Sequence, residues 1–108
     1  MKTIIAKLLV TAVLADGKRV ELDARIRAPY EGDDQYWIAR VQIKPLHKEP
    51  VDVRGVDSLH ALWLACALVL KLLAQLRAEG ARIENRDGSE FPIDAYLAGL
   101  GDSSQKSG

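Results

Sequence analysis

Residues 57–80 form the segment that most constrains the fold, because they carry the features of one long, almost wholly apolar helix with both ends marked. Asp57 is a good N-cap, since its carboxylate accepts free backbone N–H groups of the first turn, and Gly80 suits the left-handed position after a helix. At 100° per residue the larger apolar residues form one wide stripe. We expect this stripe to pack on a sheet, and it consists of Leu59, Leu62, Trp63, Cys66, Val69, Leu70, Leu73 and Leu76.

The size of the chain favours a single domain. It has 108 residues, of which 48% are hydrophobic, enough for one core. We expect an α+β domain over residues 1–101 and a flexible polar tail over 102–108. Fifteen basic residues balance fifteen acidic ones, so no overall field favours nucleic acid or an anionic membrane. The single Cys66 cannot form an internal disulfide, which favours a reducing, cytoplasmic location.

The N-terminus resembles a secretory signal in having a basic start, an apolar run and a small residue before Asp16. Lys7 interrupts the apolar run, and the segment pairs well with the one that follows, so we interpret it as a strand. The uncharged run at 61–70 is far shorter than the ~20 residues that a transmembrane helix requires. We therefore expect no association with a membrane.

Residues 3–14 and 19–28 predict a β-hairpin, and their alternation sets its register. A two-residue Asp-Gly loop would place the apolar Val10 beside Asp23. A three-residue loop that ends in a left-handed Gly17 avoids this mismatch, so we predict the bulged loop. It pairs the apolar positions of both strands, Val10 with Leu22 and Ala12 with Val20.

The middle of the chain predicts two more strands, at 35–44 and 51–56, after a loop rich in Pro, Gly and carboxylates. Gly55 would let the chain bend tightly into the helix. We predict a four-stranded antiparallel meander in chain order, with the long helix across one face. A short edge strand at 81–86 and a short helix at about 93–98 complete the expected elements.

The side of the long helix opposite the stripe is less polar than expected. His60, Lys71 and Gln75 are its polar members, and Leu64 and Leu68 lie among them. Either a second layer covers the two leucines, or they belong to a contact surface. The residues available to cover them are Phe91, Ile93, Tyr96, Leu97 and Leu100.

The sequence offers weak candidates for chemistry. Glu31, Asp33 and Asp34 share a Gly-containing loop and could hold calcium, but their spacing does not match an EF-hand. Cys66 has no suitably placed base, because His60 lies six positions away on another face. We expect no catalytic residue, no resident metal and no cofactor, although a metal- or small-molecule-dependent enzyme or sensor that uses the acidic loop is an alternative.

Nucleic-acid binding is also disfavoured. The outer sheet face combines basic residues with Tyr36, but Glu21, Asp23 and Asp52 share that face, and mixed charge is typical of a solvated surface. The basic residues are Lys7, Arg25, Arg27, Arg40 and Arg54.

Two surfaces suit a protein partner. The exposed carboxylates of Glu31, Asp33 and Asp34 would favour a basic partner. An apolar pair rimmed by polar residues suits a partner or a homodimer interface, and this strip consists of His60, Leu64, Leu68, Lys71 and Gln75.

Residues 54–62, with Asp16-Gly17 and Tyr36-Trp37, resemble a family of small, uncharacterised bacterial single-domain proteins. The shared features are an Asp-Gly hairpin, an aromatic third strand and Gly-x-Asp-Ser-x-x-Ala-Leu at the start of one long helix. His60 stands here in place of the usual glutamine. The resemblance covers about residues 3–80 and implies a fold but no activity.

By analogy of architecture alone, small bacterial proteins of this type are often immunity proteins. We therefore predict a non-enzymatic protein-binding domain, most concretely an immunity protein that blocks a cognate toxin.

Overall fold

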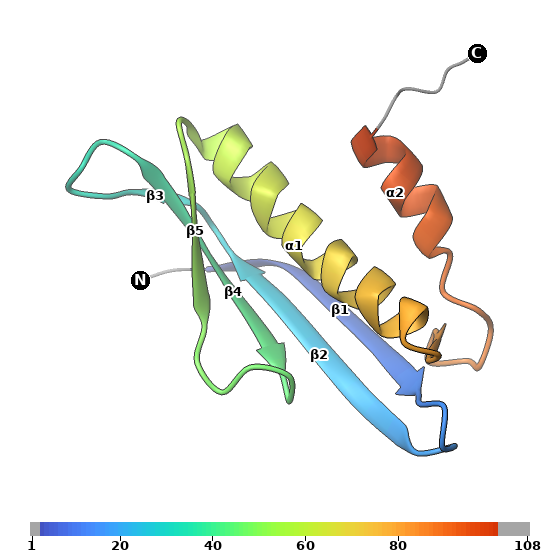
Figure 1. Ribbon diagram of the computed structural model, residues 1–108. Helices are drawn as coiled ribbons and strands as arrows, with labels where there is room; N and C mark the ends of the chain where they lie inside the picture. The colour runs from blue at the N-terminus through green and yellow to red at the C-terminus, as the bar shows by residue number, and fades with distance from the viewer. Residues whose placement is uncertain (1–2, 102–108) are drawn as a thin grey trace, which may run out of the picture.

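The computed structural model describes residues 3–101, in which one long helix lies across a curled antiparallel sheet (Figure 1). The predicted tail, 102–108, lies outside the described residues. The strands are β1 (Ile4–Val13), β2 (Arg19–Arg27), β3 (Tyr30–Glu31), β4 (Trp37–Lys44), β5 (Val51–Gly55) and β6 (Arg82–Glu84). The helices are α1 (Ser58–Ala78) and α2 (Ile93–Gly101).

The four longer strands follow the predicted meander, because β1 pairs with β2, β2 with β4, and β4 with β5, all antiparallel. Two short strands extend this order. β6 pairs with the end of β1, and β3 pairs with the beginning of β4. At the beginning of β4, β5 already occupies one edge, so β3 pairs with the opposite edge. β2 pairs with that same opposite edge nearer the end of β4. Pro29, which lacks a backbone N–H donor, separates β2 from β3 on that edge.

The predicted register of the first hairpin is confirmed. Val10 pairs with Leu22 and Ala12 with Val20. Gly17 has φ +90°, and the Leu14 N–H donates to the Lys18 carbonyl at 2.8 Å, which closes a three-residue loop. The alternation of both strands therefore places their even positions toward the helix, where Leu22, Ala24 and Ile26 are buried.

Both ends of α1 are capped as predicted. The Asp57 carboxylate accepts from the His60 backbone N–H at 2.7 Å. At the other end Gly80 has φ +105°, and the next N–H donates to the Leu76 carbonyl at 3.0 Å. These bonds satisfy backbone groups that a helix end leaves without intrahelical partners.

The predicted helix face is wrong at Leu59 and Trp63, whereas Leu62 and Cys66 of the same half pack against the core. Leu59 and Trp63 are 74% and 45% exposed, whereas Ala61 and Ala65 are fully buried. Small residues face the sheet here because α1 begins very close to β5. A Cβ at Gly55 would lie 2.4 Å from the Ala61 backbone nitrogen, so only glycine fits. Further along, Val69, Leu70 and Leu73 are buried, as the stripe predicts.

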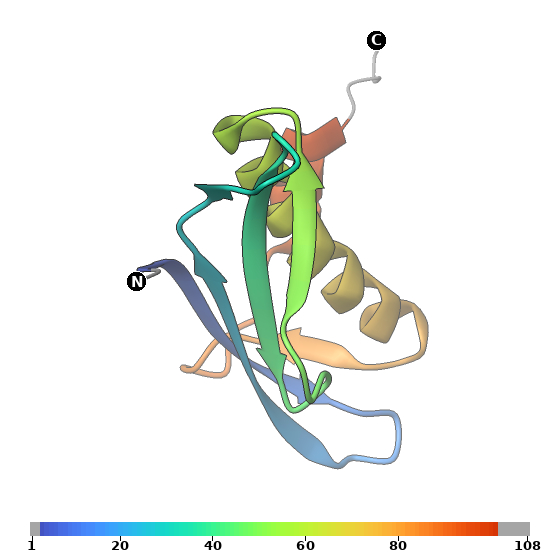
Figure 2. The same ribbon diagram turned by 90° about the vertical axis from the view of Figure 1, so that its left-hand side faces the viewer.

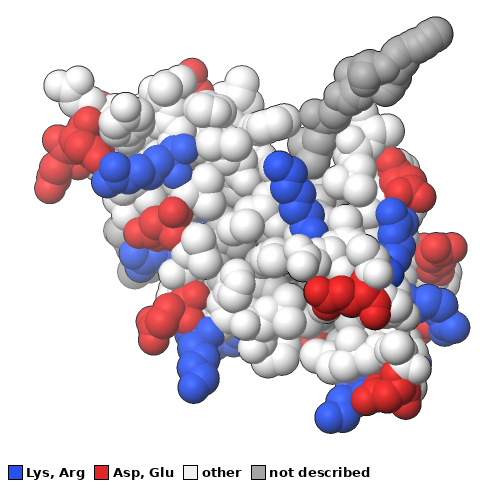
Figure 3. All heavy atoms as spheres, in the orientation of Figure 1, with Lys and Arg blue, Asp and Glu red and all other residues white. Residues whose placement is uncertain are grey.

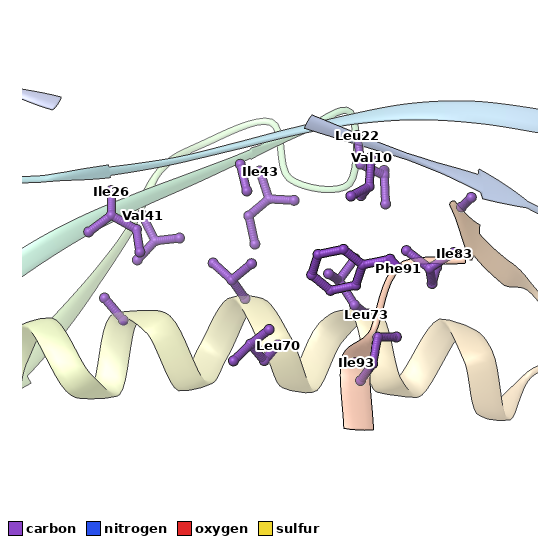
Figure 4. Packing of buried hydrophobic residues seen from close by; sticks show 14 of the residues in the cluster. Val10, Leu22, Ile26, Val41, Ile43, Leu70, Leu73, Ile83, Phe91 and Ile93 are labelled. Atoms are coloured by element: carbon purple, nitrogen blue, oxygen red, sulfur yellow. The ribbon is translucent and has the colours of Figure 1, made fainter. Parts of the chain in front are cut away.

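The C-terminal segment completes the core on one flank of α1. Phe91 and Ile93 are buried, and Figure 4 shows them beside Leu73, beneath Val10 and Leu22 of the sheet. Tyr96 stacks on Phe91 with ring centroids 4.9 Å apart.

An ion pair also ties the two helices together. The Arg77 guanidinium lies 2.8 Å from the Asp94 carboxylate, and it lowers the pKa of Asp94. By helix geometry Leu64 and Leu68 point about 160° away from Cys66 and Leu70, which line a groove together with Tyr96 of α2. Both leucines are half-buried, and Leu68 packs against the core.

Candidate functional site

Three segments meet at one end of the molecule: the loop between β3 and β4, the end of β5 and the first turn of α1 (Figure 2). The pairing of Trp37 with Gly55 holds them together. An ion pair of 2.7 Å joins Asp34 to Arg54, whose guanidinium lies 5.9 Å from the centroid of the Tyr36 ring. We call this end the helix-start surface, and it consists of Glu31, Asp33, Asp34, Tyr36, Val56, Leu59, His60 and Trp63.

Large apolar groups are exposed on the helix-start surface. Val56 is 67% exposed, Leu59 74%, Trp63 45% and Tyr36 46%. Val56, Leu59 and Trp63 line a shallow depression together with Asp57 and His60. Single exposed apolar residues are common on proteins, but several that adjoin one another are typical of an interaction site.

Acidic side chains adjoin this apolar area. Figure 3 shows carboxylates gathered at the corner of the β3–β4 loop, beside an uncharged area over the beginning of α1. Asp34 is occupied, because it binds Arg54 and accepts from the Tyr36 N–H at 3.2 Å. Within residues 3–101, the carboxylates of Glu31 and Asp33 have neither an ion pair nor a hydrogen bond. Two exposed negative charges are thus available to a partner.

The acidic loop does not converge on a metal site. Across the described residues, no three His, Cys, Asp or Glu side chains lie close enough together to hold a metal ion. Calcium needs several oxygens at once, which this loop does not present in the structure.

His60 has a structural role at the start of α1. Its Nδ1 accepts from the Val56 N–H at 3.1 Å, and its own backbone N–H binds the Asp57 carboxylate. The ring therefore holds the turn that exposes Val56 and Leu59. Of the predicted strip, His60 is the residue that lies in the shallow depression at the start of α1.

The rest of the predicted strip runs away from this end along α1. Leu64 and Leu68 are half-buried, and Leu68 packs against the core. Lys71 and Gln75 are exposed, and the Gln75 amide donates to the Glu79 carboxylate at 3.3 Å. Sequence reasoning missed the exposed apolar residues Tyr36, Val56, Leu59 and Trp63 as candidates for a contact surface, because the wheel assigned the last two to the core.

The basic residues of the outer sheet face are largely paired with acids. Arg25 forms two hydrogen bonds of 3.0 Å with Asp23, and these lower the pKa of Asp23. Arg40 binds Asp52 at 2.8 Å in the same way. Such pairs are typical of a solvated sheet surface rather than a path for a phosphate backbone.

Cys66 is half-buried beside α2, and burial raises the pKa of its thiol. It lines an apolar groove in which Lys7 and Tyr96 are the other titratable residues. A raised pKa makes a thiol less nucleophilic at neutral pH, so this environment does not activate Cys66.

Among the described residues, α1 is long and apolar enough to cross a membrane by length and composition. This is weak evidence, because the core helix of a folded domain passes the same test. Here one face of α1 packs on β4 and β5, as in such a core helix.

The fold and this surface define an α+β domain with one long helix on a curled antiparallel sheet and an apolar-acidic surface at one end. The chain belongs to the family described as Domain of unknown function (DUF6968), whose model matches residues 10–93. This is consistent with the uncharacterised single-domain family that the sequence resembles. Comparisons with curated proteins and with solved structures give no match.

Proposed function

We propose that this protein is a non-enzymatic protein-binding domain, and most concretely a bacterial cytoplasmic immunity protein that neutralises a toxin by direct binding. The observation that carries the proposal is the exposed apolar group on the helix-start surface. Leu59 and Trp63 lie in the first two turns of the central helix, yet they face solvent. Burial of such side chains by a partner removes apolar surface from water, which favours association.

The chemistry of this surface suits a basic partner. Aromatic anchors in a desolvated centre supply most of the binding energy in protein interfaces, and Trp63 and Tyr36 fit that role. The free carboxylates of Glu31 and Asp33 would lie at the rim, where charge mainly accelerates association. A toxin with a cationic active-site cleft, such as a nuclease, presents the complementary surface.

A co-expression test addresses the proposal. The candidate toxin is the product of a gene adjacent to this one, and rescue of growth by the wild-type protein is the expected result. We expect Trp63→Ala to weaken binding at least tenfold, measured by calorimetry with the purified toxin, as for an interface hot spot. Leu46→Ala is the matched control, because Leu46 is 38% exposed at the β4–β5 turn, away from this surface.

The charged rim gives a second readout. The double variant Glu31→Gln/Asp33→Asn should lower the association rate constant and weaken its dependence on salt concentration. The dissociation rate constant should change less. Tight binding of the toxin that survives Trp63→Ala and the charge changes together would contradict the assignment of this surface. Failure of the wild-type protein to bind or neutralise any neighbouring toxin would contradict the immunity function.

A further inference from the structure

The start of α1 carries two reciprocal hydrogen bonds that resemble a capping box. The Asp57 carboxylate accepts from the His60 backbone N–H at 2.7 Å, and the Nδ1 atom of the His60 ring accepts from the Val56 N–H at 3.1 Å. In the usual capping box the third helical residue is Glu or Gln, and its side chain bonds back to the backbone N–H of the N-cap. In α1 the third residue is a histidine, and its bond reaches Val56, one residue before the N-cap.

The protonation state of the His60 ring decides whether this bond exists. A backbone N–H can only donate, so Nδ1 must carry a free lone pair, and the ring is the neutral tautomer with its hydrogen on Nε2. An imidazolium carries a hydrogen on both nitrogens and accepts no hydrogen bond, whereas the amide oxygen of glutamine accepts at any pH. The bond to Val56 is therefore lost when the ring gains a proton.

Two features of the first turn act on the ring in opposite directions. The partial positive charge at the N-terminal end of a helix disfavours a cation there. The Asp57 carboxylate attracts one, and among the residues that line the depression with His60 it is the other group that titrates. A protonated ring thus has an anion to turn toward once it has released Val56.

Charged groups on the neighbouring elements act on the ring less directly. Arg54 of β5 and its ion-pair partner Asp34 lie on the outer face of the sheet, because Arg54 alternates with Val53, which packs against the core. Glu31 and Asp33 in the β3–β4 loop are exposed, so solvent and salt screen their charges. The bonds of the first turn therefore dominate the behaviour of the ring.

We infer that His60 makes the helix-start surface sensitive to pH. The neutral ring holds the turn at Val56 and Asp57, and this turn presents Val56 and Leu59 to solvent. The hold is complete above the pH at which His60 titrates, and it is lost as pH falls through that value. As a control of partner binding this inference rests on the proposed function, but the change in the turn itself does not.

The test follows the turn by NMR of the intact protein from pH 8 to pH 5, the range in which histidine side chains change charge. The amide proton shift of Val56 should move with the same midpoint as the His60 ring. After correction for the intrinsic exchange rate, the Val56 amide should exchange about two- to tenfold faster at the acidic end, the factor that corresponds to one net hydrogen bond. In His60→Gln the acceptor does not titrate, so the Val56 amide should not respond.

Two further variants keep the test decisive. His47→Gln is the matched control, because it removes the other histidine of the chain, which lies between β4 and β5, and it should leave the Val56 transition unchanged. Asp57→Asn removes the anion that attracts the protonated ring, so the transition should persist and move to lower pH. A Val56 amide that stays constant while His60 titrates would overturn the inference, as would an equal response in His60→Gln or a transition that Asp57→Asn abolishes.

Binding of the toxin from the co-expression test gives a separate readout. Between pH 7.5 and pH 5.5 the wild-type protein should lose about two- to tenfold more affinity than His60→Gln, for the same reason. Equal losses in the two proteins would overturn the control of binding. If no toxin binds at any pH, the proposed function fails, and the Val56 amide still decides whether the turn is pH-sensitive.

Discussion

Gly55→Ala tests the close approach between β5 and the start of α1. The added Cβ would lie 2.4 Å from the Ala61 nitrogen, 2.8 Å from the Ala61 Cα and 2.8 Å from the His60 carbonyl carbon. All three are backbone atoms, so no side-chain rotation relieves the contact. To regain an ordinary contact distance of 3.4 Å, the first turn of α1 must retreat by roughly 1 Å.

The expected cost follows from two opposing effects. Overpacking typically costs about 1–3 kcal/mol, and the lower entropy of alanine in the unfolded chain returns about 0.4–1 kcal/mol. We expect Gly55→Ala to lower the free energy of unfolding by about 2 kcal/mol, measured by urea unfolding. At about 4–8 °C per kcal/mol, the melting temperature should fall by roughly 8–16 °C.

Gly88 provides the matched control, because its φ of +89° makes glycine favourable while nothing lies within 4 Å of an added Cβ. Gly88→Ala should cost about 1 kcal/mol through backbone strain, and Gly88→Asn should recover most of it, since asparagine tolerates this conformation. Gly55→Asn should recover nothing. A Gly55→Ala protein within about 0.5 kcal/mol of wild type would refute the reasoning, because that is the scale of ordinary surface changes.

Further substitutions test the core, the cap and a buried carboxylate. Ile43 is 2% exposed, so Ile43→Ala should lower the free energy of unfolding by about 2–5 kcal/mol. Trp63→Ala should lower it less, although tryptophan is the larger side chain. Equal losses of unfolding free energy in urea would contradict the burial pattern. Asp57→Ala should cost about 1 kcal/mol by loss of the cap and Asp57→Asn much less, as thermal unfolding will show. The hydrogen bond from Arg82 holds the pKa of Glu84 below its ordinary 4.5. The ionised carboxylate therefore stabilises the fold at neutral pH. This stabilisation is lost as pH falls through the lowered pKa of the folded state. The difference in melting temperature between wild type and Glu84→Gln should therefore narrow from neutral pH to strongly acidic pH, and a constant difference would disprove this role.

The first hairpin was predictable because two independent patterns agree. Both strands alternate, and a shift of one residue would have placed Asp23 on the apolar face beside Val10. The position of Gly17 then left one loop length that satisfied both strands. The meander of the longer strands follows from similar alternation, whereas the two-residue β3 is too short to show a pattern.

The orientation of α1 was less predictable, because the helix is apolar almost all round. Large side chains on a wheel usually mark the buried face, but Gly55 brings α1 so close to β5 that Ala61 and Ala65 occupy the interface. Leu59 and Trp63 are consequently turned outward. The exposure of Leu59 and Trp63 could therefore not be predicted from the sequence, because it depends on the close packing of the helix against Gly55.

β4 is bordered along part of its length on both sides, by β5 on one edge and by β2 and then β3 on the other. A strand held on both edges can open only after a neighbour has detached, so its amides should be among the slowest to exchange with solvent. The acidic loop leads directly into this strand. One side of the helix-start surface is thus anchored in a strand that we expect to be among the last to open, so a partner would meet that side already in place.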